Sequence, residues 1–215
     1  MTPEEPQPIV IVRTGIANLA SVIAGVRRCN LQPLVSDDPR DIERAGRLLL
    51  PGVGAFGAAM QAINDANLAG PLRDYARSNR PMLAICLGMQ LLFERSEESL
   101  GVPGLAIAPG EARRFAGNLP IPQLGWNHIT PDSDCKLIKP GAAYFANSYR
   151  ITEPPPGFAS ARTDYGGPFI SAIERGNLLA CQFHPELSGP WGLALLKRWA
   201  TGDTAGAAMK GATAC

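Results

Sequence analysis

Short apolar runs alternate with stretches of helical spacing through the first half of the chain. Runs without polar residues are typical of strands buried on both faces of a parallel sheet. Four such strands are expected, at residues 9–12, 34–36, 47–50 and 81–85. Helices are expected after Asn18, over about 55–64 and 71–78, and a turn over 37–40. This alternation indicates an α/β fold with right-handed crossovers.

Beyond Ser99 the pattern changes to short strands separated by Gly, Pro and Asn, which favours antiparallel pairing. Strands are expected at 112–115, 126–130, 143–149 and 158–163, a hairpin at 169–174 and 178–183, and a last helix at 189–200. Residues 1–8 and 201–215 lack apolar periodicity and are expected to be a flexible N-terminus and a disordered tail. We therefore predict one α/β domain over 9–200. Its central sheet is mainly parallel, flanked by helices, with antiparallel strands in the C-terminal half.

The two periodicities meet at Cys86, directly after the apolar run 81–85. From Leu87 onward the apolar residues fall at helical spacing, and Gly88 lets a tight turn close. This is the layout of a nucleophile elbow, in which a strand-to-helix turn lifts one side chain above the sheet. The first turn of the helix would favour a thiolate at Cys86. An inert buried thiol fits this stretch equally well, because free cysteines are often buried.

Composition and charge exclude several classes of function. Hydrophobic residues make up 46% and charged residues 18% of the 215, and the net charge is +1, which gives no electrostatic reason to expect nucleic acid or an anionic membrane. No apolar run reaches the roughly 18 residues of a membrane span. The acidic, proline-rich start is unlike a secretory signal. Five scattered cysteines without ligand spacing predict no metal site and a reduced, cytoplasmic setting.

A cysteine nucleophile needs a base, and the chain has only two histidines. His184 ends an apolar strand and is followed by Pro185 and Glu186. Residues i and i+2 of an extended segment project to one side, so Glu186 can orient the His184 ring. A histidine in an exposed loop is the competing interpretation of this tripeptide taken alone. His128 has no adjacent carboxylate and is expected to be structural.

The glycine-rich stretch after the third strand has two interpretations. Gly52, Gly54 and Gly57 spell the dinucleotide-binding pattern G-x-G-x-x-G. That pattern requires an acidic residue at a strand end about 20 positions later. Asp74, the nearest acidic candidate, falls inside a helical pattern, and the strand is third rather than first.

An oxyanion hole is the other interpretation of the same stretch. Backbone N–H groups from Gly52 to Gly54, Val53 among them, would act with the N–H of Leu87 on a tetrahedral intermediate. We favour this interpretation because it also explains Cys86, which the cofactor interpretation leaves without a role. No cofactor is expected.

Three motifs together resemble the class I, triad-type glutamine amidotransferases: Pro-Gly-Val-Gly at 51–54, Cys-Leu-Gly-Met-Gln at 86–90 and His-Pro-Glu at 184–186. Their flavodoxin-like fold is therefore implied. Within the class, these stretches and Pro-Gln-Leu-Gly-Trp-Asn at 122–127 look like the amidotransferase subunits of imidazole glycerol phosphate synthase, from histidine biosynthesis.

The resemblance implies that Cys86 attacks the side-chain amide of glutamine, with His184 protonating the ammonia and Glu186 orienting His184. The ammonia would pass to a (β/α)8-barrel cyclase subunit in a heterodimer. It also implies residues that hold the substrate, namely Gly52, Gly54, Gln90, Ser148 and Tyr149. An amidotransferase serving another acceptor and a non-catalytic module with this fold are the alternatives.

The chain departs from the family pattern in three places. The first loop usually reads Asp-Tyr-Gly-x-Gly-Asn, Val-His commonly precedes the residue matching Ser148, and lysine usually follows His-Pro-Glu. At these places the chain has Arg13, Thr14 and Ala17, then Ala146 and Asn147, then Leu187. All lie where the glutaminase face is expected to meet its partner.

Overall fold

The computed structural model describes residues 8–14 and 18–202. Most of the expected flexible N-terminus, residue Ala17 and the tail from 203 lie outside this part of the chain. The strands of the large sheet are β1 (Ile9–Val12), β2 (Pro33–Ser36), β3 (Arg47–Gly52), β4 (Met82–Cys86), β7 (Gln123–Pro131), β8 (Gly141–Asn147), β10 (Ala159–Asp164), β11 (Pro168–Arg175) and β12 (Leu178–Cys181). A small sheet contains β5 (Arg95–Ser96), β6 (Glu111–Arg114) and β9 (Tyr149–Arg150).

The large sheet is mixed, and its strand order is β2-β1-β3-β4-β12-β11-β10-β7-β8. The strands from β2 to β12 pair in parallel, as expected for the N-terminal half. From β12 to β8 all pairs are antiparallel, and β11 and β12 form the expected hairpin. The predicted α/β class is confirmed. Because β12 lies beside β4, the sheet brings the segment after Cys181 next to Cys86.

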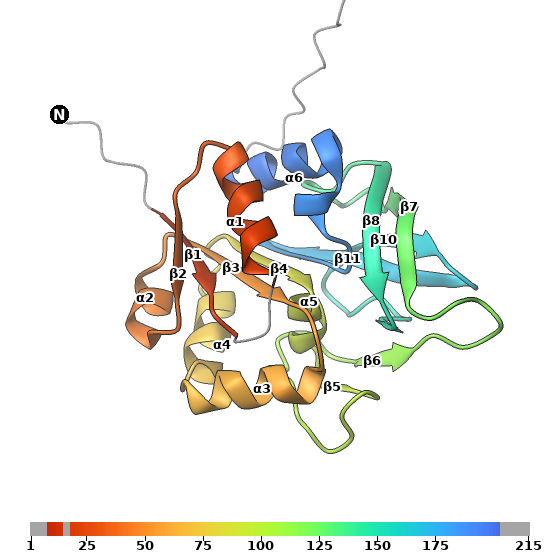
Figure 1. The fold of residues 1–215 in the computed structure, drawn as a ribbon, viewed down its shortest axis with the longest axis horizontal. Coiled ribbons are helices and arrows are strands. Elements are labelled where there is room, and N and C mark those ends of the chain that lie inside the picture. Colours follow the sequence, from red (N-terminus) through yellow and green to blue (C-terminus); the bar gives the residue numbers. More distant parts are fainter. Residues whose placement is uncertain (1–7, 15–17, 203–215) are drawn as a thin grey trace, which may run out of the picture.

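Helices cover both faces of the sheet (Figure 1). They are α1 (Leu19–Arg28), α2 (Pro39–Arg44), α3 (Phe56–Asp65), α4 (Ala69–Arg77), α5 (Leu87–Leu91) and α6 (Gly189–Thr201), with a 3-10 turn η1 (Pro185–Leu187). The α1 and α6 helices lie on one face, and α3 and α4 lie on the other (Figure 1). As expected, the side chain of Asn18 caps α1 by accepting a hydrogen bond from the Ser21 N–H.

Each face of the sheet has its own apolar core. On the α1 and α6 side, Val22, Val26 and Leu195 pack against an aromatic group that includes Phe145 and Phe183. The core on the opposite side contains Ile42, Phe56, Ile63, Leu72 and Tyr75, which are all fully buried. The carboxyl ends of the parallel strands are thereby held as a rigid platform between two packed layers.

Some expected elements differ from those observed. The turn predicted over 37–40 is instead the start of α2, because Asp38 caps the helix and Pro39 occupies its first position. Helix α4 begins at Ala69, so Pro71 is its third residue and not its first. The strand predicted over 143–149 is broken at Ser148 into β8 and β9. None of the helices within the described residues is long and apolar enough to cross a membrane.

Candidate active site

Cys86 ends β4 in a backbone conformation that non-glycine residues rarely adopt. Its φ is 55° and its ψ is −111°, and α5 begins at the next residue. Such strain persists only where the surroundings enforce it, and it is common at functional sites. A Cβ on Gly88 would lie 2.1 Å from the Leu50 carbonyl oxygen of β3, so this position requires glycine. The expected elbow is therefore present, and Cys86 is only 6% exposed.

His184 and Glu186 form a buried pair beside the elbow. His184 Nδ1 lies 2.8 Å from Glu186 Oε1, and the two side chains are 7% and 2% exposed. Glu186 belongs to η1, the short turn that follows β12, and Pro185 begins this turn. The second carboxylate oxygen, Oε2, is buried with no hydrogen-bond partner among the described residues. The carboxylate is thus directed at the His184 ring, as the sequence predicted.

Backbone contacts hold the pair in place. The His184 N–H donates to the Tyr144 carbonyl of β8 at 2.9 Å, and the hydroxyl of Ser188 donates to the His184 carbonyl at 2.6 Å. On the other side, the Arg28 guanidinium of α1 donates to the Glu186 carbonyl at 3.2 Å. The pair is therefore fixed between a strand and a helix rather than carried on a free loop.

Cys86 completes a three-residue arrangement with this pair. Burial alone lowers the pKa of His184, but its side-chain hydrogen bonds to Cys86 and to Glu186 favour the imidazolium more strongly. As a result, the pKa of His184 rises from 6.5 to about 10. Around the sulfur, Gln182 Nε2 donates to Sγ at 3.6 Å, and Sγ lies 3.9 Å from the Ala146 carbonyl oxygen. The geometry can support a nucleophile, a base and a group that orients the base.

A cavity of about 300 Å³ opens over the elbow. Its size suits a small polar molecule rather than a polymer. Cys86 and His184 lie in its wall together with most of the other predicted site residues: Val53, Gly54, Leu87, Gln90, Ser148 and Tyr149. Gly52 lies outside the lining, where it pairs with Cys86 between β3 and β4. Glu186 also lies outside the lining and reaches the site through its contact with the His184 ring. The structure therefore brings all of the predicted site residues except Gly52 and Glu186 to a single cavity.

The segment after β3 approaches the elbow closely, as the oxyanion-hole interpretation requires. Gly54 has a φ of 95°, so this segment turns in a conformation that favours glycine. Leu87 is the first residue of α5, and N–H groups in the first turn have no acceptor within the helix. Val53 and Leu87 thus line the same cavity from two elements that meet at the nucleophile.

Five residues in or beside the cavity were not predicted as site residues. Glu98 lines the wall, and its carboxylate accepts from the Phe56 N–H at 2.7 Å. Gln182 is fully buried, and its Oε1 accepts from Gln90 Nε2 at 2.9 Å, which braces Gln90. Pro122, Ala146 and Asn147 also line the cavity. Glu98 and Gln182 belong to no recognisable local pattern, and long-range folding brings them to the site.

The residues that depart from the family pattern differ in how far they are buried. Arg13 is within 4.0 Å of Asp37 in an exposed ion pair, and Thr14 is buried. Asn147 is 4% exposed, whereas Leu187 is 40% exposed directly after Glu186. His128 is exposed on β7 and outside the cavity lining.

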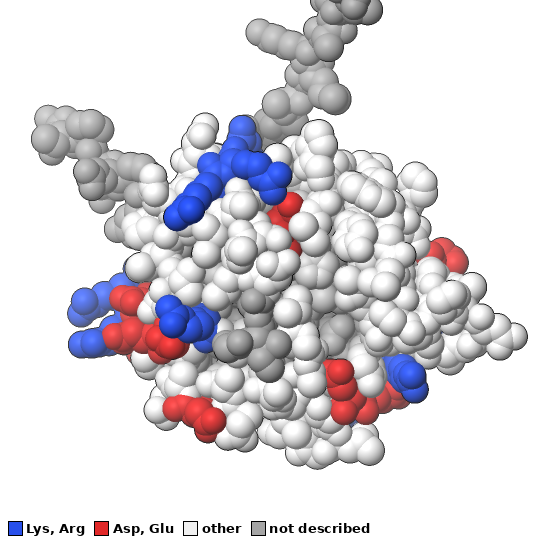
Figure 2. Space-filling model, viewed as in Figure 1, with Lys and Arg blue, Asp and Glu red and all other residues white. Residues whose placement is uncertain are grey.

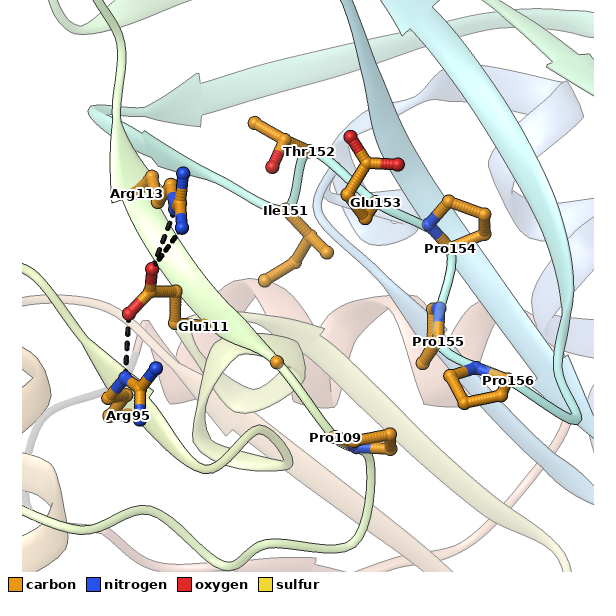
Figure 3. A pocket seen from close by; sticks show the side chains of 11 residues that line it. Arg95, Pro109, Glu111, Arg113, Ile151, Thr152, Glu153, Pro154, Pro155 and Pro156 are labelled. Carbon is orange, nitrogen blue, oxygen red and sulfur yellow. Dashed lines mark hydrogen bonds and ion pairs between the residues drawn. The ribbon is translucent and has the colours of Figure 1, made fainter.

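A second cavity, of about 350 Å³, lies away from this site (Figure 3). Arg95 and Arg113 both bind the Glu111 carboxylate on one wall, and a run of three prolines, 154–156, forms another wall. It contains none of the predicted site residues. Charged residues on the face seen in Figure 2 form small groups separated by uncharged surface. Within the described residues, no cluster of His, Cys, Asp and Glu is arranged to hold a metal.

The fold and the cavity agree with comparisons to known proteins. The family described as "Glutamine amidotransferase class-I" matches residues 15–201. The chain therefore belongs to the class-I glutamine amidotransferase family and is an enzyme of that kind, as its motifs predicted.

Its relatives identify the group within the class. The chain is 45% identical to the imidazole glycerol phosphate synthase subunit HisH of Symbiobacterium thermophilum, over 89% of this chain and 92% of that protein. It is 43% identical to the HisH subunit of Deinococcus radiodurans, over 91% and 94%. The expected resemblance to the amidotransferase subunits of this synthase is confirmed.

Solved structures agree on the fold. A crystal structure of a glutamine amidotransferase superimposes with a TM-score of 0.73 at 16% identity, covering 90% of this chain and 99% of that one. PurLQS from Thermotoga maritima gives 0.69 at 14% identity, covering 91% and 98%.

Proposed function

We propose that the chain hydrolyses glutamine to glutamate and ammonia through a thioester on Cys86, and supplies the ammonia to imidazole glycerol phosphate synthesis. The observation that carries this proposal is the Cys86–His184–Glu186 arrangement, in which Cys86 and His184 line one cavity and Glu186 contacts the His184 ring. Relatives named as subunits of imidazole glycerol phosphate synthase support the product's destination.

The first half of the reaction forms the thioester. The Cys86 sulfur attacks the side-chain carbonyl carbon of glutamine, and the oxygen becomes an oxyanion facing the N–H groups of Val53 and Leu87. Each such donor is worth about 3–4 kcal/mol of transition-state stabilisation. The carbon–nitrogen bond then breaks, and His184 gives its proton to the departing nitrogen, which leaves as ammonia.

The second half releases glutamate. Neutral His184 accepts a proton from water, whose oxygen attacks the thioester carbon and displaces the Cys86 sulfur. Glu186 holds the imidazole in one orientation and stabilises the imidazolium, which matches its single contact with Nδ1. Gln90, Ser148, Tyr149 and the backbone at Gly52 and Gly54 hold the amino-acid end of the substrate.

The acceptor of the ammonia is a (β/α)8-barrel cyclase subunit in a heterodimer, working in the cytoplasm. One relative supports a close association between the two activities. The chloroplastic imidazole glycerol phosphate synthase hisHF of Arabidopsis thaliana is 38% identical over 89% of this chain, which matches only 33% of that protein. That protein therefore carries a long further segment beside the part that matches this chain.

The test separates ammonia production from synthesis. In the complex with the cyclase, Cys86→Ala should abolish product formation from glutamine, whereas ammonium salts at alkaline pH should still support it. His184→Ala should behave alike because the residues act as a unit. Glu186→Ala should be milder because the base remains. If Cys86→Ala removed both activities from an assembled complex, ammonia donation would be the wrong role for this chain.

A further inference from the structure

Two buried carboxamide oxygens on neighbouring strands have no hydrogen-bond partner among the described residues. They are Oε1 of Gln123 and Oδ1 of Asn147, and these side chains belong to residues only 3% and 4% exposed. The β7–β8 register places the two residues directly opposite each other. Opposite residues of an antiparallel pair point to the same face, with Cβ atoms about 5 Å apart. The two side chains therefore start from neighbouring positions on the same face of the sheet.

The orientation of the Asn147 carboxamide is set by its other end. Its Nδ2 donates to the Tyr149 carbonyl oxygen at 2.9 Å. Turning the amide over would place Oδ1 against that carbonyl, so the oxygen must point away from it. Buried acceptors are nearly always satisfied in folded proteins, by protein atoms or by ordered water. A pair of unsatisfied acceptors thus indicates a site for a small hydrogen-bond donor.

Gln123 and Asn147 lie near the cavity in which the substrate's nitrogen is released at Cys86. Asn147 lines the cavity together with Cys86 and His184, and so does Pro122, the residue before Gln123. Asn147 also follows Ala146, whose carbonyl oxygen lies 3.9 Å from the Cys86 sulfur. A molecule released at Cys86 therefore enters a cavity that Asn147 also lines.

We propose that Gln123 and Asn147 form an acceptor pair that holds ammonia after its release at Cys86. The inference rests on the proposed glutaminase function. The carbon–nitrogen bond breaks at the thioester-forming step and His184 supplies the proton, so neutral ammonia arrives and no further bond changes. Ammonia has three N–H bonds and can donate to both oxygens at once. The side-chain carboxylate of glutamate carries only acceptors, so the pair discriminates between the two products. Water fills the pair between turnovers.

Gln123→Met tests the pair cleanly. Methionine has a similar shape and lacks the oxygen, and Gln123 Oε1 makes no hydrogen bond to the described residues that would be lost. In the complex with the cyclase, we expect the nitrogen incorporated per glutamate formed to fall at least twofold, with the remainder appearing as free ammonium. Glutamate, cyclised product and ammonium are measured in one sample, so the ratio is independent of the overall rate.

Ser160→Ala is the matched control. Ser160 Oγ is also buried without a partner among the described residues, but it belongs to β10 and lies outside the cavity lining. In the Ser160→Ala complex, the nitrogen incorporated per glutamate formed should equal that of the unchanged chain. If Gln123→Met does not unfold cooperatively, Gln123→Leu replaces it with the same expectation. A ratio unchanged in the Gln123 variant, or lowered equally in Ser160→Ala, overturns the acceptor pair. Failure of the unchanged complex to form glutamate would refute the glutaminase function instead.

Discussion

Cys86 differs from the other described cysteines in its surroundings. Burial raises the pKa of Cys29, raises that of Cys135 to about 12, and raises that of Cys181 well above its usual value. Cys86 instead lines a cavity together with His184, whose pKa its side chain raises. Its thiol is therefore the one placed for attack on a bound electrophile.

A glutamine-mimicking electrophile should consequently label one cysteine, in the peptide that contains Cys86. Mass spectrometry after digestion identifies the labelled peptide, and Cys86→Ala serves as the control that should take up no label. Excess glutamine should slow the labelling because both compounds occupy the same cavity. Labelling spread evenly over Cys29, Cys135 and Cys215 would contradict the assignment.

The raised pKa of His184 predicts a pH-dependent contribution to stability. The pKa is about 10 in the folded chain and near 6.5 in the unfolded chain, so folding favours the protonated ring. This contribution is fully present below pH 6.5 and is lost as the pH rises through about 10. The free energy of unfolding of the unchanged chain should therefore fall, relative to that of His184→Gln, between these values. Urea titrations at several pH values measure this difference.

The same group can be followed directly by NMR. Cys86→Ala removes the strongest of the contacts that raise the pKa, so the apparent pKa of the His184 ring should fall in that variant. An unchanged pKa would show that Cys86 and His184 are not coupled.

Among single residues, the sequence indicated those with distinctive chemistry but not the residues that lie beside them in the folded site. Cys86, His184 and Glu186 could be proposed because each occurs in a short pattern with a recognisable geometry. Gln182 and Asn147 could not, because a buried amide has no sequence signature. Their positions at the site depend on strands that pair over long distances along the chain.

The strand-to-helix elbow depends on one close backbone approach. An added Cβ at Gly88 would overlap the Leu50 carbonyl oxygen, so Gly88→Ala should force β3 and the elbow apart. We expect a loss of stability of about 1–3 kcal/mol, as for other overpacked cores. Glutamine turnover should fall about 100-fold, because displacements near 1 Å misplace a nucleophile. Urea unfolding and glutamate release measure the two effects.

Gly70→Ala in α4 is the matched control for this substitution. A Cβ at Gly70 meets no heavy atom within 4 Å, and alanine favours a helix over glycine. Its stability should be equal or slightly higher, and its turnover unchanged. Equal behaviour of the two variants would show that close packing at the elbow has no special role.

Elements were predictable where the apolar pattern was long and uninterrupted. The buried strands β1, β3 and β4 follow directly from their apolar runs. Helix α2 was missed because its single buried side chain, Ile42, gives too short a pattern to distinguish a helix from a turn. Strands β5 and β9 contain two residues each, and their pairing partners alone define them.

For the whole molecule, glutamine turnover is expected to depend on the presence of the cyclase partner. The segment from Gly52 to Gly54 borders the cavity, and its glycines permit a peptide to flip at low cost. We expect little glutamine turnover by the isolated chain and strong stimulation by a cyclase loaded with its own substrate. Glutamate release is measured with and without that partner. Full turnover by the isolated chain would contradict this expectation.

The arrangement of the whole sheet was only partly predictable. Strand–helix alternation correctly indicated parallel pairing in the first half, and glycine-rich turns indicated antiparallel pairing in the second. The placement of β12 against β4 was not evident, since pairing between distant strands depends on the complete core. That pairing nevertheless decides that His184 lies beside Cys86.

The position of β12 has a consequence for the order of events during synthesis. The ribosome makes Cys86 before residues 178–186, and at 5–20 residues per second the delay is about 5–20 s. Until β12 inserts beside β4, the open edge of β4 presents an apolar strand to other nascent chains. The thiol also lacks its base over this interval, so an unfinished chain consumes no glutamine. Insertion of a single late strand then closes the exposed edge and brings the base to the thiol in one step.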